Sequence, residues 1–323
     1  MTGDSMDSVL RYFAHSEVRP SQIDMVKDGM DALLGDGFLL ASAPTGIGKT
    51  AAALASAIAA QRTSTEHLRI LFLTGRQSQH KIVVDTINKI NQQMPDNEGT
   101  LRLVDLIGRE GMCRNVDRMS GKCDCEEDLD GNLREELRAD VRSQMFRQSM
   151  HVDDVIRVSR RVKLCPWATA RDAAKSCDIL VCDYNHVFID NVREASLPSM
   201  SIELENCILI VDEAHNLPDR VRNGLERRAI AKIFRDSRFE VQEHIEREQN
   251  LTSQSEEETE LEHMEWLEKA LKRLEKDMPS WFSIREKELS RSDSDDMRIE
   301  TTSLLNEIDA ILNESIEDTH STP

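Results

Sequence analysis

The chain has 323 residues, of which 39% are hydrophobic and 31% are charged, and its formal net charge is −19 at pH 7. That composition is typical of a globular protein, and apolar runs of about 18 residues, which a membrane-spanning helix needs, do not occur. The first residues carry acids without a basic-then-apolar signal pattern, so we expect an intracellular protein, cytoplasmic or, in a eukaryote, nuclear. Residues 241–323 hold 23 acidic and 9 basic residues, so the net charge does not exclude a nucleic-acid partner for the rest.

Helical and strand-like segments alternate at the start of the chain. The spacing of apolar residues predicts, in order, a helix, a buried strand, a helix, a buried strand and a helix, at Gln22–Leu34, Gly37–Ser42, Thr50–Gln61, Leu68–Leu73 and Gln79–Ile90. This order is that of a parallel sheet covered by helices, which makes the fold class α/β.

The pattern changes near residue 107 and again after residue 222. Strand-like runs return at Cys177–Asp183 and Cys207–Val211, so residues 108–171 form an insertion inside one α/β domain. The last part is helical, with apolar faces at Leu261–Met278 and near the end, at Leu304, Leu305, Ile308, Ile311 and Leu312. The polar runs at residues 253–260 and 290–296 are predicted loops or disordered segments.

The stretch APTGIGKT at residues 43–50 follows the first predicted strand and precedes a predicted helix. A phosphate loop needs a tight, amide-rich turn at a helix N-terminus together with a cation. Gly46 and Gly48 permit that backbone, Lys49 would reach the β and γ phosphates, and Thr50 would offer its hydroxyl to Mg²⁺. Thr45 completes the predicted loop, and Ala43 stands where the strict motif has its first glycine.

The stretch ILIVDEAHN ends another predicted strand with two carboxylates. Because parallel strands end at one edge of a sheet, these carboxylates should lie beside the phosphate loop. Asp212 would hold Mg²⁺, Glu213 would polarise the attacking water as general base, and His215 could couple the nucleotide to a neighbouring domain.

The two motifs together resemble motifs I and II of superfamily 2 helicases and translocases, which implies a RecA-like P-loop NTPase domain that binds ATP and Mg²⁺. The segment Arg19-Pro20-Ser21-Gln22 resembles the one in which a glutamine contacts adenine, so Gln22 is a predicted nucleotide contact. Residues 74–79, TGRQSQ, resemble motif Ia of the XPD and DinG group, which implies that Arg76 contacts the DNA backbone.

Four cysteines are spaced in a way that resembles one branch of that superfamily. The opening Gly108-Arg109-Glu110-Gly111-Met112-Cys113 and the closing Leu164-Cys165-Pro166-Trp167 resemble the ends of the [4Fe–4S] insertion of XPD-like helicases, with Cys123 and Cys125 between them. The resemblance implies a cubane cluster on four thiolates. The single residue Asp124 between the middle pair departs from the family, which commonly has two or more.

The same four cysteines have two alternatives to the cluster, and three further cysteines have a different expected role. Zinc on the same four cysteines is the nearest alternative, and free thiols are a third, although a polar loop is a poor place to bury Cys123 and Cys125. The remaining cysteines lie in apolar runs and are expected to be small core residues: Cys177, Cys182 and Cys207.

The resemblance also implies a single-strand DNA path beside the cluster. Arg109 stands next to the first cysteine, and Tyr184 follows a strand, where it could either stack on a base or pack inside the protein. A set of basic residues in the insertion suits a surface that follows phosphates, or equally a solvated helix face: Arg134, Arg138, Arg142, Arg147, Arg157, Arg160, Arg161 and Lys163.

We therefore expect a RecA-like ATPase domain at residues 1–107 and 172–225, an iron–sulfur insertion at 108–171 and an arch-like helical region at 226–323. The resemblance implies a monomeric, ATP-dependent 5′-to-3′ DNA helicase that acts on single-stranded or forked DNA, truncated in the arch. Because nothing after His215 resembles a second ATPase domain, the alternative is an incomplete half-helicase that binds DNA or a protein partner. A zinc-bearing ATPase of another branch is a third hypothesis.

Overall fold

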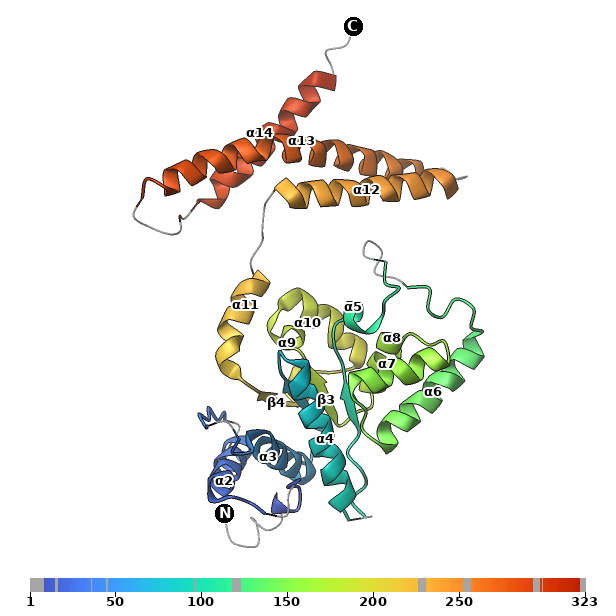
Figure 1. Cartoon of the computed structure of the whole chain (residues 1–323), viewed down its shortest axis with the longest axis vertical. Coiled ribbons are helices and arrows are strands. Elements are labelled where there is room, and N and C mark those ends of the chain that lie inside the picture. The colour runs from blue at the N-terminus through green and yellow to red at the C-terminus, as the bar shows by residue number, and fades with distance from the viewer. Residues whose placement is uncertain are drawn as a thin grey trace. The chain divides into compact units, whose positions relative to one another are not determined.

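The computed structural model describes residues 9–14, 17–35, 37–44, 46–95, 97–117, 123–225, 231–251, 257–292, 297 and 299–319. The chain divides into two compact units, Met1–Leu225 and Glu226–Pro323, which are described separately below (Figure 1). Within the described residues, no helix combines the length and the apolar character that crossing a membrane would require.

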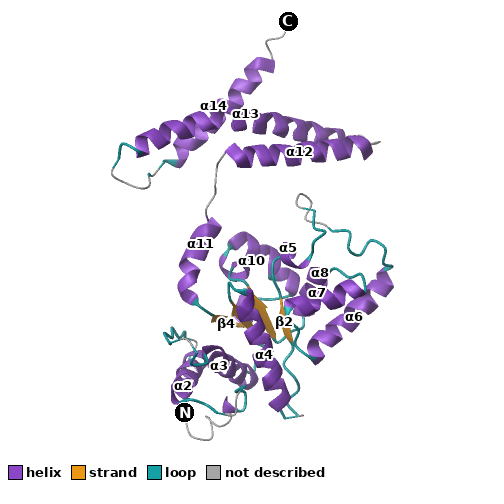
Figure 2. Cartoon of the chain, in the orientation of Figure 1, coloured by secondary structure: helices purple, strands orange, loops and turns teal. Residues whose placement is uncertain are grey.

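The first unit is built on four parallel strands, drawn in orange in Figure 2. The strand order across the sheet is β2-β3-β1-β4, and the strands are β1 (Arg69–Leu73), β2 (Leu103–Asp105), β3 (Ile179–Cys182) and β4 (Cys207–Val211). In the register, Leu71 of β1 lies opposite Leu180 of β3 and Leu209 of β4. The strands are nearly continuous apolar runs because helices cover both faces of a parallel sheet.

One face of the sheet packs against the N-terminal helices. Ile70 and Phe72 of β1 share a core with three helices, α2 (Pro20–Leu34), α3 (Lys49–Thr63) and α4 (Gln77–Gln93). Nine of the ten positions 51–60 of α3 are buried, because its alanines let the helix approach α2 and the sheet closely. Successive β residues point to opposite faces, so Leu71 and Leu73 enter a different core.

The opposite face packs against helices of the insertion and those that follow it. This second core includes Met112, Met145 and Val155, none of which exposes more than 1% of its surface. The helices here are α5 (Arg109–Met112), α6 (Gly131–Arg147), α7 (Val152–Arg161), α8 (Pro166–Ala174), α9 (Asn185–Phe188) and α10 (Asp190–Ser196). The insertion is therefore one layer of the same domain, and it shares the core of the sheet.

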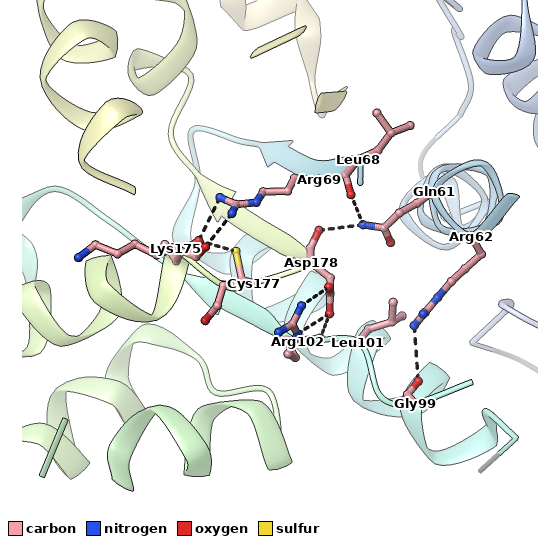
Figure 3. A network of polar contacts seen from close by, with 12 residues as sticks. Gln61, Arg62, Leu68, Arg69, Gly99, Leu101, Arg102, Lys175, Cys177 and Asp178 are labelled. Atoms are coloured by element: carbon pink, nitrogen blue, oxygen red, sulfur yellow. Dashed lines mark hydrogen bonds and ion pairs between the residues drawn. The ribbon is translucent and has the colours of Figure 1, made fainter. Parts of the chain in front are cut away.

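The strands begin in a polar network at one edge of the sheet (Figure 3). Arg102 donates from Nε and Nη2 to both carboxylate oxygens of Asp178, at 3.0 and 2.8 Å. Gln61 donates to the carbonyls of Leu68 and Asp178, and Arg69 donates to the Lys175 carbonyl at 2.6 Å. These contacts fix the N-terminal ends of β1 and β3, and leave the C-terminal ends for the predicted site.

The predicted strand at Gly37–Ser42 is wrong in this structure. No strand is assigned to those residues, and Phe38 and Leu40 expose 92% and 83% of their surface. A strand needs a neighbour for its backbone amides and carbonyls, and β4 is the last strand of the described sheet on that side. The apolar run predicted burial, but periodicity cannot supply the partner strand.

Most other predicted elements are confirmed, with ends shifted by a few residues. The strands predicted at Leu68–Leu73, Cys177–Asp183 and Cys207–Val211 correspond to β1, β3 and β4, and the three predicted helices correspond to α2, α3 and α4. Strand β2 was not predicted from the sequence. It has three residues and ends just before the insertion begins. The connecting helix α11 (Leu217–Leu225) follows the carboxylate motif.

The second unit contains three helices, α12 (Ala231–Leu251), α13 (Glu257–Leu289) and α14 (Thr301–Thr319). Its small core is centred on Met278, Trp281 and Ile311, and the predicted apolar faces are confirmed in part, because Leu267 and Leu305 are exposed. Glu275 accepts from Arg235 at 2.7 Å and from Arg238 at 3.0 Å, so ion pairs link α12 to α13. Of the predicted loop at residues 253–260, the part from residue 257 on is helical and residues 253–256 lie outside the described residues.

Candidate functional site

The predicted phosphate loop has the backbone that an anion site requires. Gly46 and Gly48 have φ angles of 81° and 85°, a region that favours glycine, and Lys49 begins α3 directly afterwards. A side chain at Gly48 would also meet Gln22, whose Nε2 lies 2.2 Å from the position of an added Cβ. The loop thus presents the N-terminus of a 15-residue helix, the terminus that attracts phosphate.

Gln22 is held against this loop by the preceding segment. Its Oε1 accepts from the backbone N–H of Arg19 at 2.8 Å, and the Arg19 guanidinium donates to the Gly46 carbonyl at 2.7 Å. Gln22 is 5% exposed. The segment predicted to contact adenine therefore lies beside the phosphate loop, whereas Thr45 lies outside the described residues.

The predicted carboxylates lie opposite the lysine at the C-terminal edge of the sheet. Lys49 Nζ is 3.8 Å from Glu213 Oε1 and donates to the Ala43 carbonyl at 3.2 Å. Glu213 Oε2 lies 3.4 Å from Nδ1 of the exposed His215. Asp212 is joined to the end of β1, since its N–H donates to the Leu73 carbonyl at 2.9 Å.

Asp212 has the character of a cation ligand. Burial, followed by the nearby Glu213 charge, raises the pKa of its carboxyl group above the ordinary value. Its Oδ2 is buried and has no hydrogen-bond partner among the described residues. An unpaired buried carboxylate oxygen is costly, and a divalent cation would remove that cost. These residues therefore fit ATP with Mg²⁺: Lys49 and the loop amides would hold phosphates, and Asp212 with Thr50 would hold the metal.

One further residue of this site was missed. Thr74, which directly follows β1, is 1% exposed and gives Asp212 a side-chain hydrogen bond that opposes the rise in its pKa. The signal was available, because a hydroxyl residue at the C-terminal end of a neighbouring parallel strand is placed at the same edge.

The four predicted cysteine ligands come together in the insertion. The sulfur atoms of Cys113, Cys123, Cys125 and Cys165 all lie within 4.8 Å of one another. Cys113 Sγ is 3.3 Å from Cys125 Sγ, and Cys123 Sγ is 3.7 Å from Cys165 Sγ. The single residue between Cys123 and Cys125 does not prevent both thiols from facing the same point, because residues 125–128 form a turn.

Charged neighbours hold this cysteine pocket in shape. Glu126 accepts from the backbone N–H of Cys165 at 2.9 Å and from Arg138 at 2.5 Å, so it joins the loop to two helices. Arg109 donates to Cys123 Sγ at 3.5 Å, and its guanidinium carbon lies 4.7 Å from the ring centroid of Trp167. These contacts orient the ligands as outer-shell contacts do in metal sites.

The surroundings of these thiols shift their pKa values in different directions. Burial raises the pKa of Cys165 to about 12 and raises that of Cys125. Burial is also the largest influence on Cys123 and acts to raise its pKa, but hydrogen bonds from Arg109, from the Cys125 backbone and from neighbouring thiols together outweigh it and leave the pKa of that thiol below its ordinary value. A metal would deprotonate all four thiols. The donor set fits a thiolate-bound metal, and Arg109 would be the cation nearest to the bound group.

Two of the other three cysteines, Cys177 and Cys182, are buried as predicted, whereas Cys207 is only partly buried. Cys177 and Cys182 are fully covered, and Cys207 begins β4. Burial raises the pKa of Cys177 to about 12 and that of Cys207 to about 11. These thiols are packing residues of the sheet.

The residues predicted to contact DNA lie in different environments. Arg76 is exposed at the start of α4, where motif Ia was predicted. Tyr184 is 2% exposed, and its hydroxyl donates to the Asp212 carbonyl at 2.5 Å. The structure therefore supports the packing alternative for Tyr184, and a covered ring is not available to stack on a base.

Several of the predicted phosphate-following residues already have acidic partners. Arg142 donates to Asp172 at 2.8 Å, and Arg138 contacts both Glu126 and Glu135. Arg157 pairs with Asp154, and Arg160 donates to the Met112 carbonyl at 3.3 Å. Much of the positive charge of the insertion is thus compensated within it.

Comparison with known proteins agrees with this geometry. The family model DEAD_2 matches residues 61–229, which is just over half of the chain. The chain is 26% identical to the ATP-dependent DNA helicase chl1 of Schizosaccharomyces pombe over 168 residues, 47% of this chain and 19% of that protein. It is 32% identical to the Fanconi anemia group J protein homolog of Gallus gallus over 78 residues, 24% of this chain and 6% of that protein.

Further similarities extend the comparison. Over 68 residues, 21% of this chain and 6% of the relative, it is 37% identical to the regulator of telomere elongation helicase 1 homolog of Drosophila mojavensis. A solved XPD helicase structure is similar in fold over 94% of this chain and 48% of its own, with a TM-score of 0.50 and 19% identity. The matched parts are thus a small fraction of the relatives' length, 6% to 19% in these three proteins. The chain belongs to the DEAD_2 family, the XPD-like iron–sulfur branch of the superfamily 2 helicases.

Proposed function

We propose that this chain binds ATP with Mg²⁺ and single-stranded DNA, as the first RecA-like half of a 5′-to-3′ DNA helicase with a [4Fe–4S] insertion. The observation that carries the proposal is the approach of Lys49 to Glu213, 3.8 Å apart, beside the unpaired Asp212 oxygen. The family relationship and the names of the relatives, which are ATP-dependent DNA helicases, support it. Polarity and the single-strand substrate rest on resemblance to the family.

Each residue has a part in this mechanism that follows from its place. Lys49 would neutralise charge on the transferred phosphoryl group, and Asp212 would hold Mg²⁺ against the phosphates. Glu213 would take a proton from the attacking water at the γ phosphate. Cys113, Cys123, Cys125 and Cys165 would hold the cluster, which would supply a rigid, charged anchor for the insertion, and Arg109 would donate to the Cys123 thiolate.

The alternative is a half-helicase that binds but does not turn over. The exposed segment Gly37–Ser42 favours it, because the strand that would anchor the phosphate loop is not part of the described sheet. Helicases of this class also close their cleft with a second domain, whose arginine is worth roughly 10³ to 10⁵ in rate. This alternative predicts that the chain binds nucleotide without rapid hydrolysis.

The test is a titration of the 323-residue protein with a fluorescent ATP analogue, with and without Mg²⁺, followed by a steady-state ATPase assay. Saturable, Mg²⁺-dependent binding is expected, with slow turnover. Absence of any nucleotide binding by a folded protein would overturn the proposal. Rapid turnover and strand displacement by the monomer would instead eliminate the half-helicase alternative.

A further inference from the structure

A pocket of about 240 Å³ opens where the predicted motif Ia meets the helix after the carboxylate motif. Its walls come from the end of β1, the start of α9 and from α11, and they include the catalytic candidate Glu213. The residues that line it are Thr74, Gly75, Arg76, Tyr184, Glu213, Asn216, Asp219, Arg220 and Asn223. The pocket therefore touches both the predicted DNA segment and the predicted nucleotide site.

Two guanidinium groups give this pocket an affinity for anions. Arg76 is exposed, and no ion pair or hydrogen bond joins its side chain to another described residue. Arg220 uses Nη2 to donate to Asp183 at 2.8 Å, and a guanidinium carries five N–H donors. Asn216 and Asn223 add amide groups that can donate to oxygen.

The carboxylates that line the pocket do not cancel these cations. Glu213 lies 3.8 Å from Lys49 and 3.4 Å from His215, and Asp219 is paired with Arg222 at 2.9 Å. Guanidinium groups bind phosphate oxygens through paired hydrogen bonds. An exposed pocket with two such groups and side-chain amides suits a phosphodiester of a nucleic-acid strand.

The backbone of Glu213, which lines the pocket, has an unusual conformation. Its φ is 49°, and this left-handed conformation raises the free energy of any residue other than glycine. It therefore persists only where neighbouring residues hold it. The Glu213 carbonyl accepts from Asn216 Nδ2 at 3.2 Å, and the Tyr184 hydroxyl lies 3.4 Å away while it donates to Asp212 at 2.5 Å. Two pocket residues thus hold the strained turn in place.

Tyr184 also connects this turn to motif Ia. A Cβ at Gly75 would lie 3.2 Å from Tyr184 Cε2, so the Gly75 backbone is packed directly on the tyrosine ring. The residue after Gly75 is Arg76, the exposed cation of the pocket. The backbone next to Arg76 is therefore in contact with the ring whose hydroxyl donates to the Asp212 carbonyl.

We propose that Arg220, together with Arg76, binds a phosphate of single-stranded DNA in this pocket, and that Tyr184 links its occupancy to the position of Glu213. The inference rests on the proposed binding of DNA by this chain. It assigns a DNA contact to α11, and it gives the buried Tyr184 a positioning role. Linkage is reciprocal. If DNA in this pocket changes the affinity for nucleotide by some factor, nucleotide must change the affinity for DNA by the same factor.

The first experiment measures binding of a fluorescein-labelled oligo-dT by anisotropy at several salt concentrations. Arg220→Ala and the milder Arg220→Gln should weaken binding about tenfold, since a charge-assisted hydrogen bond is worth about 1.5–3 kcal/mol, and should lower the salt slope by about one. The matched control is Lys89→Ala, which removes an exposed cation near the C-terminal end of α4 that does not line the pocket. Inorganic phosphate as competitor should not displace the oligonucleotide at equal concentration.

The second experiment repeats the titration with and without a non-hydrolysable ATP analogue and Mg²⁺. The wild-type dissociation constant should shift with the analogue, and Tyr184→Phe, which removes only the hydroxyl, should bring that ratio close to one. Equal affinities for Arg220→Ala and Lys89→Ala would overturn the pocket, and an unchanged ratio in Tyr184→Phe would overturn the link. A wild-type protein that binds the ATP analogue but no oligonucleotide would contradict both this site and the DNA-binding part of the proposed function.

Discussion

At the scale of single residues, the predicted nucleotide site consists of a few charged side chains at one edge of the sheet. Lys49, Asp212 and Glu213 were found from two short motifs, because the spacing of glycines and carboxylates carries their chemistry. Thr74 and the pocket residue Arg220 were not found, since their roles depend on which strand ends lie side by side. Sequence motifs therefore predict which groups would react, but not which residues would position them.

The charge of Lys49 is predicted to be essential for nucleotide affinity. Lys49→Ala should weaken binding of a fluorescent ATP analogue by about tenfold or more, because a hydrogen bond between charged groups is worth about 1.5–3 kcal/mol. Lys81→Ala, at an exposed position of α4, is the matched control and should bind like the wild type. Equal weakening by both substitutions would point to a general charge effect.

Glu213 is predicted to act in hydrolysis and not in binding. Glu213→Gln keeps the size of the side chain and removes its basicity, so any turnover should fall about 10²- to 10⁴-fold while the ATP analogue remains bound. The check is the ATPase rate at saturating nucleotide beside the dissociation constant. Loss of binding with unchanged turnover per bound nucleotide would contradict the assignment.

Asp212 is predicted to lower the stability of the folded protein at neutral pH and to bind the metal ion. Its pKa is raised in the folded protein, so the carboxyl stabilises the fold when protonated, and that stability is lost as pH rises through the folded pKa. At neutral pH the charged form is therefore a cost, and Asp212→Asn should raise the melting temperature slightly while it abolishes the effect of Mg²⁺ on nucleotide affinity. A melting temperature that falls would show that the carboxylate is satisfied without metal.

At the scale of helices and strands, the spacing of apolar residues predicted the elements that bury a continuous apolar stripe or run. Helices α2, α3 and α4 and strands β1, β3 and β4 follow from apolar periodicity, because each buries a continuous stripe or run. The segment Gly37–Ser42 has an equally apolar sequence, yet it lies exposed because its neighbour in the sheet is not among the described strands. β2 was overlooked because three residues give too short a pattern.

This difference in burial predicts a difference in stability. Leu40→Ser should change the free energy of unfolding by no more than about 0.5 kcal/mol, as is usual at exposed positions. Leu71→Ala, at a fully buried position of β1, should cost about 2–5 kcal/mol. Urea denaturation compares the two, and a large cost at Leu40 would show that the segment is a buried strand in solution.

At the scale of the whole molecule, the insertion and the sheet share one core, so the proposed metal and nucleotide sites belong to a single unit. The cysteines predicted to ligate differ from those predicted to pack in their surroundings in the sequence. Cys123 and Cys125 occur in a polar stretch, whereas Cys177 and Cys182 occur in apolar strands. What the sequence could not supply was the identity of the bound group, because four thiolates suit zinc as well as iron.

The metal content of the purified chain is the most direct test of this account. Protein prepared without oxygen should be brown, should absorb near 400 nm and should contain iron and sulfide in equal amounts, about four of each per chain. Cys125→Ser should lose most of this content, while Cys177→Ser, at a packing position, should retain it. A colourless protein with one zinc per chain, or a full cluster in Cys125→Ser, would contradict the assignment of a [4Fe–4S] centre to these four cysteines.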